Sequence, residues 1–512
     1  MRNGPCEEMR HQASWRIFLP ASSEARLLAI DLGYEDLLCL CRAGQRVHVS
    51  GGPRGVVQRI QKQLAVETGG GERVTTTSLA EAVGPFDGIA MDLSSDAEKG
   101  VSQAAAWLAP GGTLVVVGRG KHVRRGVREL GRDFEIPRHY AVLPPASGKL
   151  TLPLTPARVT RSALRMYVPG SRWKRYAGAF AKCLSRCGLS RLLAQRGLAV
   201  VRRKASGGHA GTEPGYFFSW LERELGWTVG GVALYVYTGA YDAAKVGKLT
   251  VQLLDDRGHV LGVLKQSDAA AGGEKIRQEV AALTRLEGEA GFLGMVPRVL
   301  LEGEKWGRRF FVQSAVTSRR ASCPERLTSA HVRFLARLAS VDLVEKPLEE
   351  WSGWRPLSEW TSHVAEDGSA GGVQLGAHLE ACRRSLSGIW LPFHRVHGDF
   401  ARSNVLLGGA SVSVVDWEES HDDGLPFLDM VHFGLRQLVK YGEESLPVTA
   451  LLQKPGRTLG VERAVLRLAA AAPELERFAR DPGRRHAVLV LCVLLELKRQ
   501  FESLQPAAAT VS

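Results

Sequence analysis

The segment RVHGDFARSNVLL (395–407), followed by SVSVVDWEE (411–419), carries the polar residues that decide the fold. Asp399 follows an apolar-to-His step in a predicted loop, where a carboxylate is exposed to substrate. The apolar residues after Asn404 predict a strand, and the second segment predicts its hairpin partner, which delivers Asp416 beside Asn404. A carboxylate and an amide oxygen placed together suit Mg²⁺. The pattern therefore favours phosphoryl transfer, which needs a proton acceptor and metal ligands.

HGDxxxxN followed by DWE resembles the motif of the aminoglycoside phosphotransferase and choline kinase family, which has a protein-kinase-like fold. The resemblance implies that Asp399 is the catalytic base and that His397 supports its loop. It implies Asn404 and Asp416 as metal ligands, with ATP and Mg²⁺ as cofactors. It also implies an acceptor hydroxyl on a small molecule, sugar or glycan. A hairpin whose Asp and Asn only cap turns would explain single residues of the motif but not the set.

LPFLDM (425–430) resembles the family's later acidic stretch and places Asp429 in a loop-supporting role. The acids Glu419, Asp422 and Asp423 hint at a pocket for a cationic acceptor, although surface acids are the commoner explanation. The residues that would choose the acceptor lie in the most variable part of the fold, so the acceptor itself stays open.

The stretch before this motif predicts a small antiparallel sheet with one helix, followed by a mostly helical lobe. The expected elements are a helix at 216–226, strands at 230–239, 247–256, 259–267 and 308–316, and a helix at 274–287. By the resemblance, Lys265 at a strand end binds the ATP phosphates and Glu279 on the following helix holds that lysine. A snorkelling strand-end lysine and a surface glutamate are the alternative.

The predicted phosphate loop, TGAYDAAKVG (238–247), contains only Gly239 and Gly247 and lacks the GxGxxG spacing of protein kinases. We expect Gly239 to approach the nucleotide and Gln313 to face the adenine as a hinge residue. A phosphate loop without this spacing favours a competing hypothesis, in which the protein is a non-catalytic pseudokinase scaffold. The complete set of Asp399, Asn404 and Asp416 argues against that hypothesis.

The N-terminal half alternates strands and helices, which indicates a parallel, doubly wound sheet. Strands are expected at 25–33, 45–51, 86–94 and 111–118, with helices at 55–67 and 101–109. FDGIAMDLS (86–94) and LAPGGTLVVVG resemble class I S-adenosylmethionine methyltransferases. Only Gly33 is available after the first strand, and Ser50 stands where an acidic ribose ligand is expected, so we expect a methyltransferase-like fold that has lost catalysis. A bifunctional methyltransferase–kinase of surface polysaccharide modification is the alternative.

The predicted fold class is thus α/β plus α+β, a Rossmann-like methyltransferase-type domain followed by a bilobal protein-kinase-like domain. We expect the first domain at 1–204, a linker at 205–215, and the kinase-like domain at 216–505. Residues 119–204 hold 21 basic and 3 acidic residues. This excess favours contact with an anionic lipid or glycan carrier, although a solvated basic face explains it equally well.

Other function classes receive little support from the sequence. The basic segment has few interleaved aromatic residues and no nucleic-acid-binding signature, so nucleic acid is an improbable partner. The eight cysteines form no zinc or disulfide spacing. The start of the chain is polar and no apolar run is long enough to span a bilayer, so we expect a cytoplasmic protein without a transmembrane segment.

Overall fold

The computed structural model of the chain divides into two compact units, which we describe separately. The first comprises residues 1–240, 244–273 and 300–315, and the second comprises 241–243, 274–299 and 316–512. Within these ranges the structure describes residues 17–20, 24–32, 37, 40–41, 46–51, 55–68, 73–76, 84–93, 98–143, 149–154, 157–166, 196–204, 217–236, 248–267, 270–316, 326–366, 370–408, 411–441 and 448–504.

The first unit is built on one thirteen-stranded sheet with the order β12-β13-β11-β10-β9-β7-β6-β8-β5-β4-β1-β2-β3. Its strands are β1 (Arg26–Ile30), β2 (Arg46–Ser50), β3 (Val74–Thr76), β4 (Phe86–Leu93), β5 (Leu108–Arg119), β6 (Arg138–Leu143), β7 (Lys149–Pro153), β8 (Arg196–Arg202), β9 (Gly231–Val236), β10 (Lys248–Leu254), β11 (Val260–Ser267), β12 (Val299–Lys305) and β13 (Arg308–Ser314). Its helices are α3 (Val56–Thr68), α4 (Glu98–Ala106), α5 (Gly120–Arg128), α6 (Ala157–Met166) and α8 (Phe217–Leu225).

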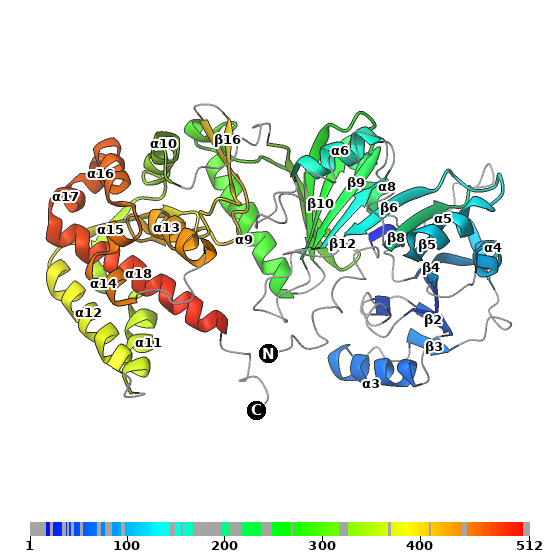
Figure 1. Cartoon of the computed structure of the whole chain (residues 1–512), viewed down its shortest axis with the longest axis horizontal. Helices are drawn as coiled ribbons and strands as arrows, with labels where there is room; N and C mark the ends of the chain where they lie inside the picture. Colours follow the sequence, from blue (N-terminus) through cyan, green and yellow to red (C-terminus); the bar gives the residue numbers. More distant parts are fainter. Residues whose placement is uncertain are drawn as a thin grey trace. The chain divides into compact units, whose positions relative to one another are not determined.

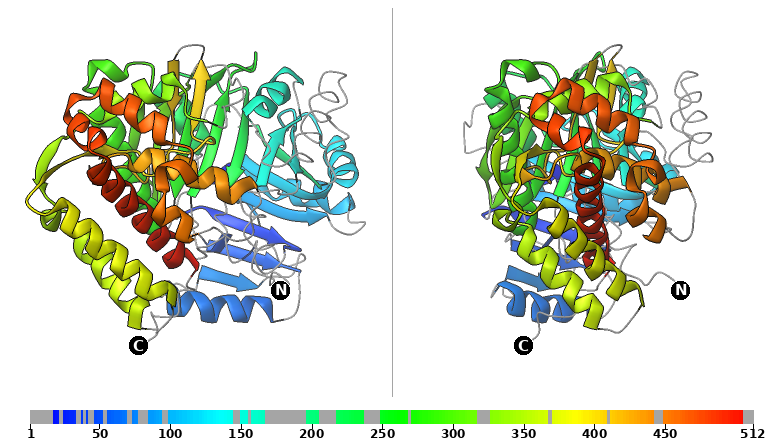
Figure 2. Two further views of the ribbon diagram at one scale, coloured as in Figure 1. Left: turned by 60° about the vertical axis from the view of Figure 1, so that its left-hand side comes forward. Right: turned by 90° about the vertical axis from the view of Figure 1, so that its left-hand side faces the viewer.

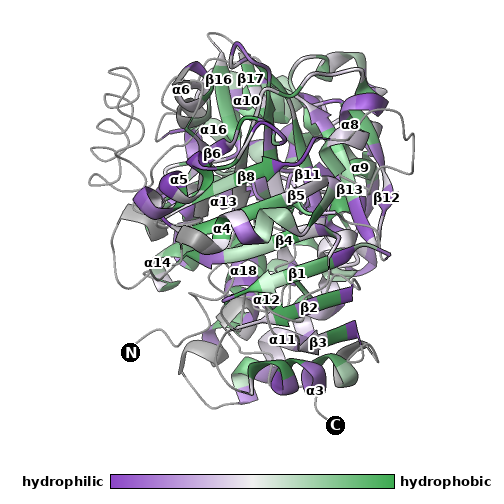
Figure 3. Ribbon diagram, turned by 90° about the vertical axis from the view of Figure 1, so that its right-hand side faces the viewer, coloured by the Kyte–Doolittle hydropathy of each residue, from purple (hydrophilic) through white to green (hydrophobic). Residues whose placement is uncertain are grey.

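The N-terminal part of this sheet is doubly wound. Strands β3, β2, β1, β4 and β5 pair in parallel, and β8 adds to β5 in the antiparallel sense. On β1, Leu27 and Ala29 belong to one apolar core while Leu28 and Ile30 belong to another, so both faces of the sheet are covered. Figure 3 shows β1, β4 and β5 largely in the hydrophobic colour. This two-sided burial is typical of parallel sheets with helical crossovers.

The predicted strand at 111–118 is longer in the structure than the sequence suggested. β5 begins at Leu108, and the Pro-Gly-Gly turn lies inside it with Gly111 at a φ of 79°. Gly112 cannot be replaced without strain, because a β-carbon there would lie 2.9 Å from the carbonyl oxygen of Ala109. The turn therefore creates an irregularity between β4 and β5, where the register shifts between Phe86 and Gly88.

Strands β9 to β13 continue the same sheet, because β9 pairs with β7 in the antiparallel sense. Figure 1 shows β9 and β10 side by side in green, and β7 lies between β9 and β6 in the sheet order. Strands β9, β10, β11 and β13 correspond to strands that the sequence predicts, whereas the sequence does not predict β12. The expected division of the chain at 205–215 stays a prediction, since those residues lie outside the described ranges.

The second unit is mostly helical. Apart from α9 (Ala270–Glu287), inside which the division between units falls, it contains η4 (Ala290–Phe292), α10 (Ser329–Leu338), β14 (Val344–Pro347), η5 (Leu348–Glu350), α11 (Trp354–Glu366), α12 (Ala370–Leu386), β15 (Trp390–Val396), β16 (Val405–Gly408), β17 (Ser411–Val414), β18 (His421–Gly424), α13 (Leu428–Tyr441), α14 (Val448–Gln453), α15 (Pro455–Thr458), α16 (Glu462–Ala471), α17 (Pro473–Arg480) and α18 (Pro482–Leu504). Figure 2 shows α18 in red beside α13 in orange, and the two helices pack together.

Two small β-structures in this unit position the loop around Asp399. β14, β15 and β18 form a three-stranded sheet, and β16 pairs with β17 as the predicted hairpin. The loop between β15 and β16 contains His397, Asp399 and Asn404, and Asp416 follows β17. Among the residues that the structure describes, no helix is long and apolar enough to cross a membrane.

Candidate active site

The backbone of the loop after β15 is held by hydrogen bonds to side chains. The amide nitrogens of His397 and Gly398 donate to the two carboxylate oxygens of Asp429, at 2.9 and 3.0 Å. His397 is fully buried, its Nδ1 accepts from the amide of Asp399, and its Nε2 donates to the carbonyl of Val415. These bonds fix the loop from both sides, and the loop-supporting roles of His397 and Asp429 stay predictions.

Asp399 projects from this loop with both of its carboxylate oxygens hydrogen-bonded. Asn404 Nδ2 donates to Oδ2 at 2.9 Å, and His432 Nε2 lies 2.9 Å from Oδ1. Arg436 Nη2 lies 3.6 Å from the same oxygen, and 29% of the Asp399 side chain is exposed. Burial acts to raise the pKa of Asp399, but the hydrogen bond and charge of His432 and the charge of Arg436 hold it below its ordinary value. The Asp399 carboxylate is therefore ionised and accessible to a substrate from solvent.

The predicted metal ligands lie beside this carboxylate. The amide of Val415, which precedes Asp416, donates to the carbonyl of Asn404 at 2.9 Å. Because the side-chain nitrogen of Asn404 bonds to Asp399, the side-chain oxygen of Asn404 is the atom suited to a cation. Asp416 has a φ of 72°, a conformation that residues with a side chain adopt rarely and that clusters at functional sites.

Three carboxylates converge at Asp416. One oxygen each from Glu279, Asp416 and Glu418 lies within 4.8 Å of the others, and Glu279 is fully buried. The amide of Trp417 donates to Glu279 Oε1 at 3.3 Å. Like charges this close repel one another unless a cation or protons compensate, and oxygen ligands are those that Mg²⁺ prefers. The donor set therefore fits a divalent metal.

The expected nucleotide-binding residues lie in the first unit. Lys265 is buried in β11, opposite Thr250 of β10 and Phe311 of β13. Gln313 is buried in β13, and among the described residues its Oε1 has no hydrogen-bond partner. Gly239 lies outside the described residues. The pairing of Lys265 with Glu279 stays a prediction, because the two residues lie in different units.

Residues 244–433 match the phosphotransferase enzyme family. The matched range contains Lys265, Glu279, Gln313 and the whole loop motif from His397 to Asp416, but neither Gly239 nor Glu496. The match confirms the resemblance drawn from HGDxxxxN and DWE. It also confirms the kinase-like part of the predicted fold class. The comparison with curated proteins found no significant match to this sequence.

Several solved structures similar to part of this chain are methyltransferases. A predicted O-methyltransferase from Agrobacterium tumefaciens is 13% identical, covers 40% of this chain and 96% of its own, and has a TM-score of 0.25. Geranyl diphosphate C-methyltransferase from Streptomyces coelicolor is 11% identical over 39% of this chain and 77% of its own, with a TM-score of 0.24. A putative precorrin-6Y methyltransferase domain from Corynebacterium diphtheriae is 13% identical over 40% and 100%, with a TM-score of 0.24.

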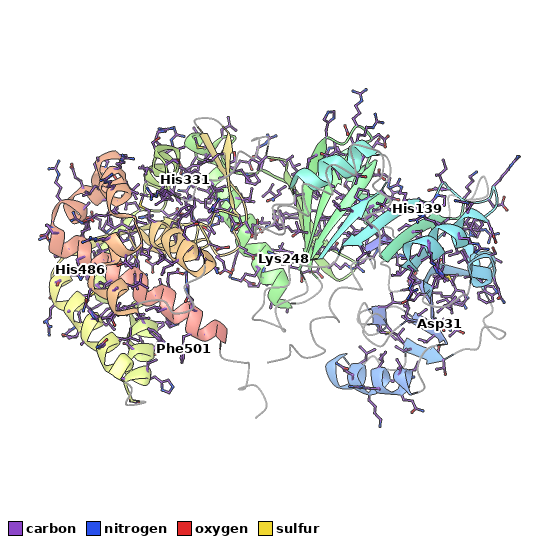
Figure 4. All side chains as sticks on the ribbon, in the orientation of Figure 1. Asp31, His139, Lys248, His331, His486 and Phe501 are labelled. Carbon is purple, nitrogen blue, oxygen red and sulfur yellow. The ribbon has the colours of Figure 1, made fainter. Side chains whose placement is uncertain are left out.

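The edge of the N-terminal sheet where a nucleotide cofactor binds in doubly wound folds is lined by Asp31, Ser50 and Gly51. Asp31 follows β1 with a φ of 53° and is labelled in Figure 4. Its amide donates to the carbonyl of Ser50, and a β-carbon on Gly51 would lie 2.1 Å from Asp31 Oδ1. The Asp31 carboxylate thus packs directly over the backbone after β2. Gly33 lies outside the described residues.

Sequence reasoning missed His432, Arg436 and Glu496, which surround Asp399 from α13 and α18. Glu496 was the clearest available signal, because it interrupts the apolar run AVLVLCVLLEL in a long helix. A carboxylate with 5% of its side chain exposed is rare unless it is paired. Its partner His432 comes only three residues after Asp429, but nothing local in the sequence joins the two residues.

Proposed function

We propose that this protein is an ATP- and Mg²⁺-dependent phosphotransferase that acts on a hydroxyl group of a small molecule, sugar or glycan. The observation that carries the proposal is the state of Asp399, an ionised and partly exposed carboxylate fixed by Asn404 and His432. Phosphoryl transfer depends on positioning and charge stabilisation more than on covalent chemistry, so such a fixed carboxylate suits the role of base. The family match supports the same reaction class.

Each site residue receives a role under this proposal. Asp399 orients the acceptor hydroxyl and takes its proton. The side-chain oxygen of Asn404 and the carboxylate of Asp416 hold Mg²⁺, which, when bound, supplies charge neutralisation at the phosphates. Lys265 orients the phosphates and Glu279 holds that lysine. Gln313 and Gly239 contact the nucleotide.

The charges near Asp399 favour an acceptor other than a polycation. Glu419 is paired with Lys275 at 2.8 Å, and Asp423 is paired with Lys346 at 2.7 Å. These acids are therefore committed to ion pairs within the second unit. The charged side chains that lie against Asp399 are His432 and Arg436, which are cationic. We infer that a hydroxyl on a neutral or anionic sugar or glycan fits better than one on an aminoglycoside.

The basic segment adds a second element to the proposal. In α5, Val123 and Val127 are buried while Lys121, Arg125 and Arg128 are exposed. One face of the helix packs on the sheet and the other presents positive charge, as an anionic lipid or glycan carrier would require. Vesicles containing anionic lipid should bind the protein more tightly than neutral vesicles do, and neutralising the three exposed residues should remove the difference.

Thermal stability with and without Mg²⁺–ATP tests the proposal. A ligand that binds only the folded state stabilises it, by about 2.7 kcal/mol at one hundred times its Kd. Stabilisation of the wild type should be absent from Asp416→Ala and retained in Asp422→Ala, whose exposed side chain lies on β18. No stabilisation of the wild type at millimolar ATP (roughly a thousand times a micromolar Kd) would favour the scaffold hypothesis instead. Calorimetric titration with S-adenosylmethionine separately tests the bifunctional alternative.

A further inference from the structure

His432 connects the proposed base to a second buried carboxylate. Its Nε2 lies 2.9 Å from Asp399 Oδ1, and its Nδ1 lies 2.9 Å from Glu496 Oε2. The side chains of His432 and Glu496 are only 6% and 5% exposed. Helices α13 and α18, which carry them, pack together (Figure 2). The three side chains therefore form one continuous line from the loop into the core.

The number of protons on this line follows from the atoms involved. An ionised carboxylate accepts hydrogen bonds and cannot donate them, so each ring nitrogen of His432 must carry a hydrogen. A histidine with both nitrogens protonated is an imidazolium cation. Arg436 Nε also lies 3.3 Å from His432 Nε2, but two donors cannot share that contact. Nε2 of His432 lies closer to Asp399 Oδ1 than to Arg436 Nε, so we assign its hydrogen to the bond with Asp399. Arg436 is instead a second cation beside Asp399 Oδ1.

The surrounding charges agree with this assignment. Arg499 Nη1 donates to Glu496 Oε1 at 3.0 Å and to the carbonyl of Gly398 at 3.3 Å. Burial acts to lower the pKa of His432, but the charge of Glu496 and the hydrogen bonds to both carboxylates raise it to about 9. Burial likewise acts to raise the pKa of Glu496, and His432 and Arg499 hold it below its ordinary value. Two anions, Asp399 and Glu496, thus lie close to three cations. The cations are His432, Arg436 and Arg499.

We propose that His432 and Glu496 are positioning residues that hold Asp399 as an oriented anion, with His432 as a permanent imidazolium. The inference rests on the proposed function, in which Asp399 is the base. Asn404 fixes one carboxylate oxygen and His432 fixes the other, so the carboxylate plane cannot rotate. Glu496 acts through His432 and touches no reacting atom.

The arrangement also determines where the transferred proton goes. In the transfer, the acceptor oxygen bonds to the γ-phosphorus, the bond from that phosphorus to the bridging oxygen breaks, and ADP leaves. The acceptor's hydroxyl proton passes to Asp399. His432 already carries two protons and cannot take a third, so this proton leaves Asp399 directly to water at its exposed edge. The line of residues is an electrostatic anchor and not a proton relay.

Turnover of Mg²⁺–ATP by the full chain tests the anchor. Glu496→Gln keeps the shape of the side chain but removes the charge that holds His432 protonated. We expect kcat to fall roughly 10- to 100-fold, because misplacing a reacting group has effects of that size. KM for Mg²⁺–ATP should stay within about twofold of the wild type. The matched control is Glu502→Gln on the same helix, where the exposed Glu502 pairs with Lys498, and its kcat should be unchanged. Equal kcat in both variants would overturn the inference.

Nitrogen-15 spectra of the imidazole rings supply a readout that needs no activity. At about pH 8, where ordinary histidines are neutral, the wild type should show one doubly protonated ring. The signal should be missing from His432→Gln and converted to a neutral ring in Glu496→Gln. A neutral His432 in the wild type would overturn the anchor even if ATP is turned over. If the wild type shows the imidazolium but neither binds nor hydrolyses Mg²⁺–ATP, the proposed function fails while the charge assignment stands.

Discussion

The backbone of Gly398 lies against that of Glu419, so closely that a β-carbon on Gly398 would be 2.2 Å from the Glu419 carbonyl oxygen. Gly398 also has a φ of 79°, a conformation that favours glycine. This contact joins the loop that carries Asp399 to the segment that follows Asp416. The glycine of HGD is therefore required by packing as well as by conformation.

Gly398→Ala should consequently destabilise the second unit and displace Asp399. The left-handed conformation alone costs about 1 kcal/mol for alanine, and the overlap with backbone adds to it because backbone cannot rotate away. Gly460→Ala is the matched control, since Gly460 has a φ of 66° but no atom within 4 Å of its β-carbon position. In urea unfolding, Gly398→Ala should lose clearly more stability than Gly460→Ala. Equal losses would show that the close approach to Glu419 is absent.

Asp429→Asn should loosen the same loop from its other side. The carboxylate accepts from two backbone amides, whereas asparagine offers one acceptor oxygen and places an NH₂ group against the second amide. One buried amide is then left unsatisfied, at a cost of about 1–3 kcal/mol. The urea midpoint and the Mg²⁺–ATP-dependent stabilisation should both fall. Asp422→Asn, which changes an exposed carboxylate, should leave both quantities as in the wild type.

The parts of the site that could be predicted from sequence are those fixed by local spacing. Asp399 and Asn404 share one loop and Asp416 follows the next strand, so a short motif reports all three. His432 reaches Asp399 across 33 residues and Glu496 reaches His432 across 64, and no local pattern encodes such contacts. The roles of these residues come from packing between helices, which only the structure shows.

In the fold, too, locally encoded elements can be predicted from sequence and pairings between distant segments cannot. Strands with a short apolar run at their centre, such as β1 and β4, are predicted from sequence because burial on both faces leaves a clear signal. β12 was missed because VLLEGEK is only half-buried and lies at the edge of the sheet. The pairing of β7 with β9 joins two sequence regions that look like separate domains. Neither strand carries a residue pattern that specifies its neighbour.

The burial of His331 should make the free energy of unfolding depend on pH in the acidic range. It is fully buried at the start of α10, where its Nδ1 accepts from the amide of Thr328 at 3.0 Å (His331 is labelled in Figure 4). Burial lowers the pKa of His331 from 6.5 to about 4. Between these values the unfolded chain binds a proton that the folded chain does not, so stability falls as the pH decreases from about 6.5 towards about 4. The contribution is at most about 3 kcal/mol.

His331→Gln should remove this dependence, because glutamine can accept from the Thr328 amide without titrating. The stability difference between wild type and variant, from urea unfolding, should favour the wild type near neutral pH and shrink as the pH falls. His421, whose pKa is also lowered to about 4, is present in both proteins and cancels. His363→Gln changes an exposed histidine and should leave the slope unchanged. A constant difference across the range would mean that folding does not change the pKa of His331.

Glu279→Gln separates two roles for the buried glutamate of α9. If Glu279 binds the metal with Asp416 and Glu418, the variant relieves repulsion among three carboxylates and loses one ligand. The metal-free protein should then be more stable than the wild type by about 1 kcal/mol, since near like charges raise the free energy by that order. Stabilisation by Mg²⁺ should be smaller. Glutamine retains the oxygen that accepts from Trp417, so the local fold is preserved.

Glu287→Gln on the same helix, where the side chain is exposed, is the control for this comparison and should respond to Mg²⁺ as the wild type does. Equal stabilisation of Glu279→Gln and wild type by Mg²⁺ would exclude Glu279 as a ligand and leave the pairing with Lys265 as its remaining role.

In that case the effects of Glu279→Gln and Lys265→Met on stability should be non-additive, because residues that contact each other couple in double-mutant cycles. Additive effects together with a reduced response to Mg²⁺ would assign Glu279 to the metal alone.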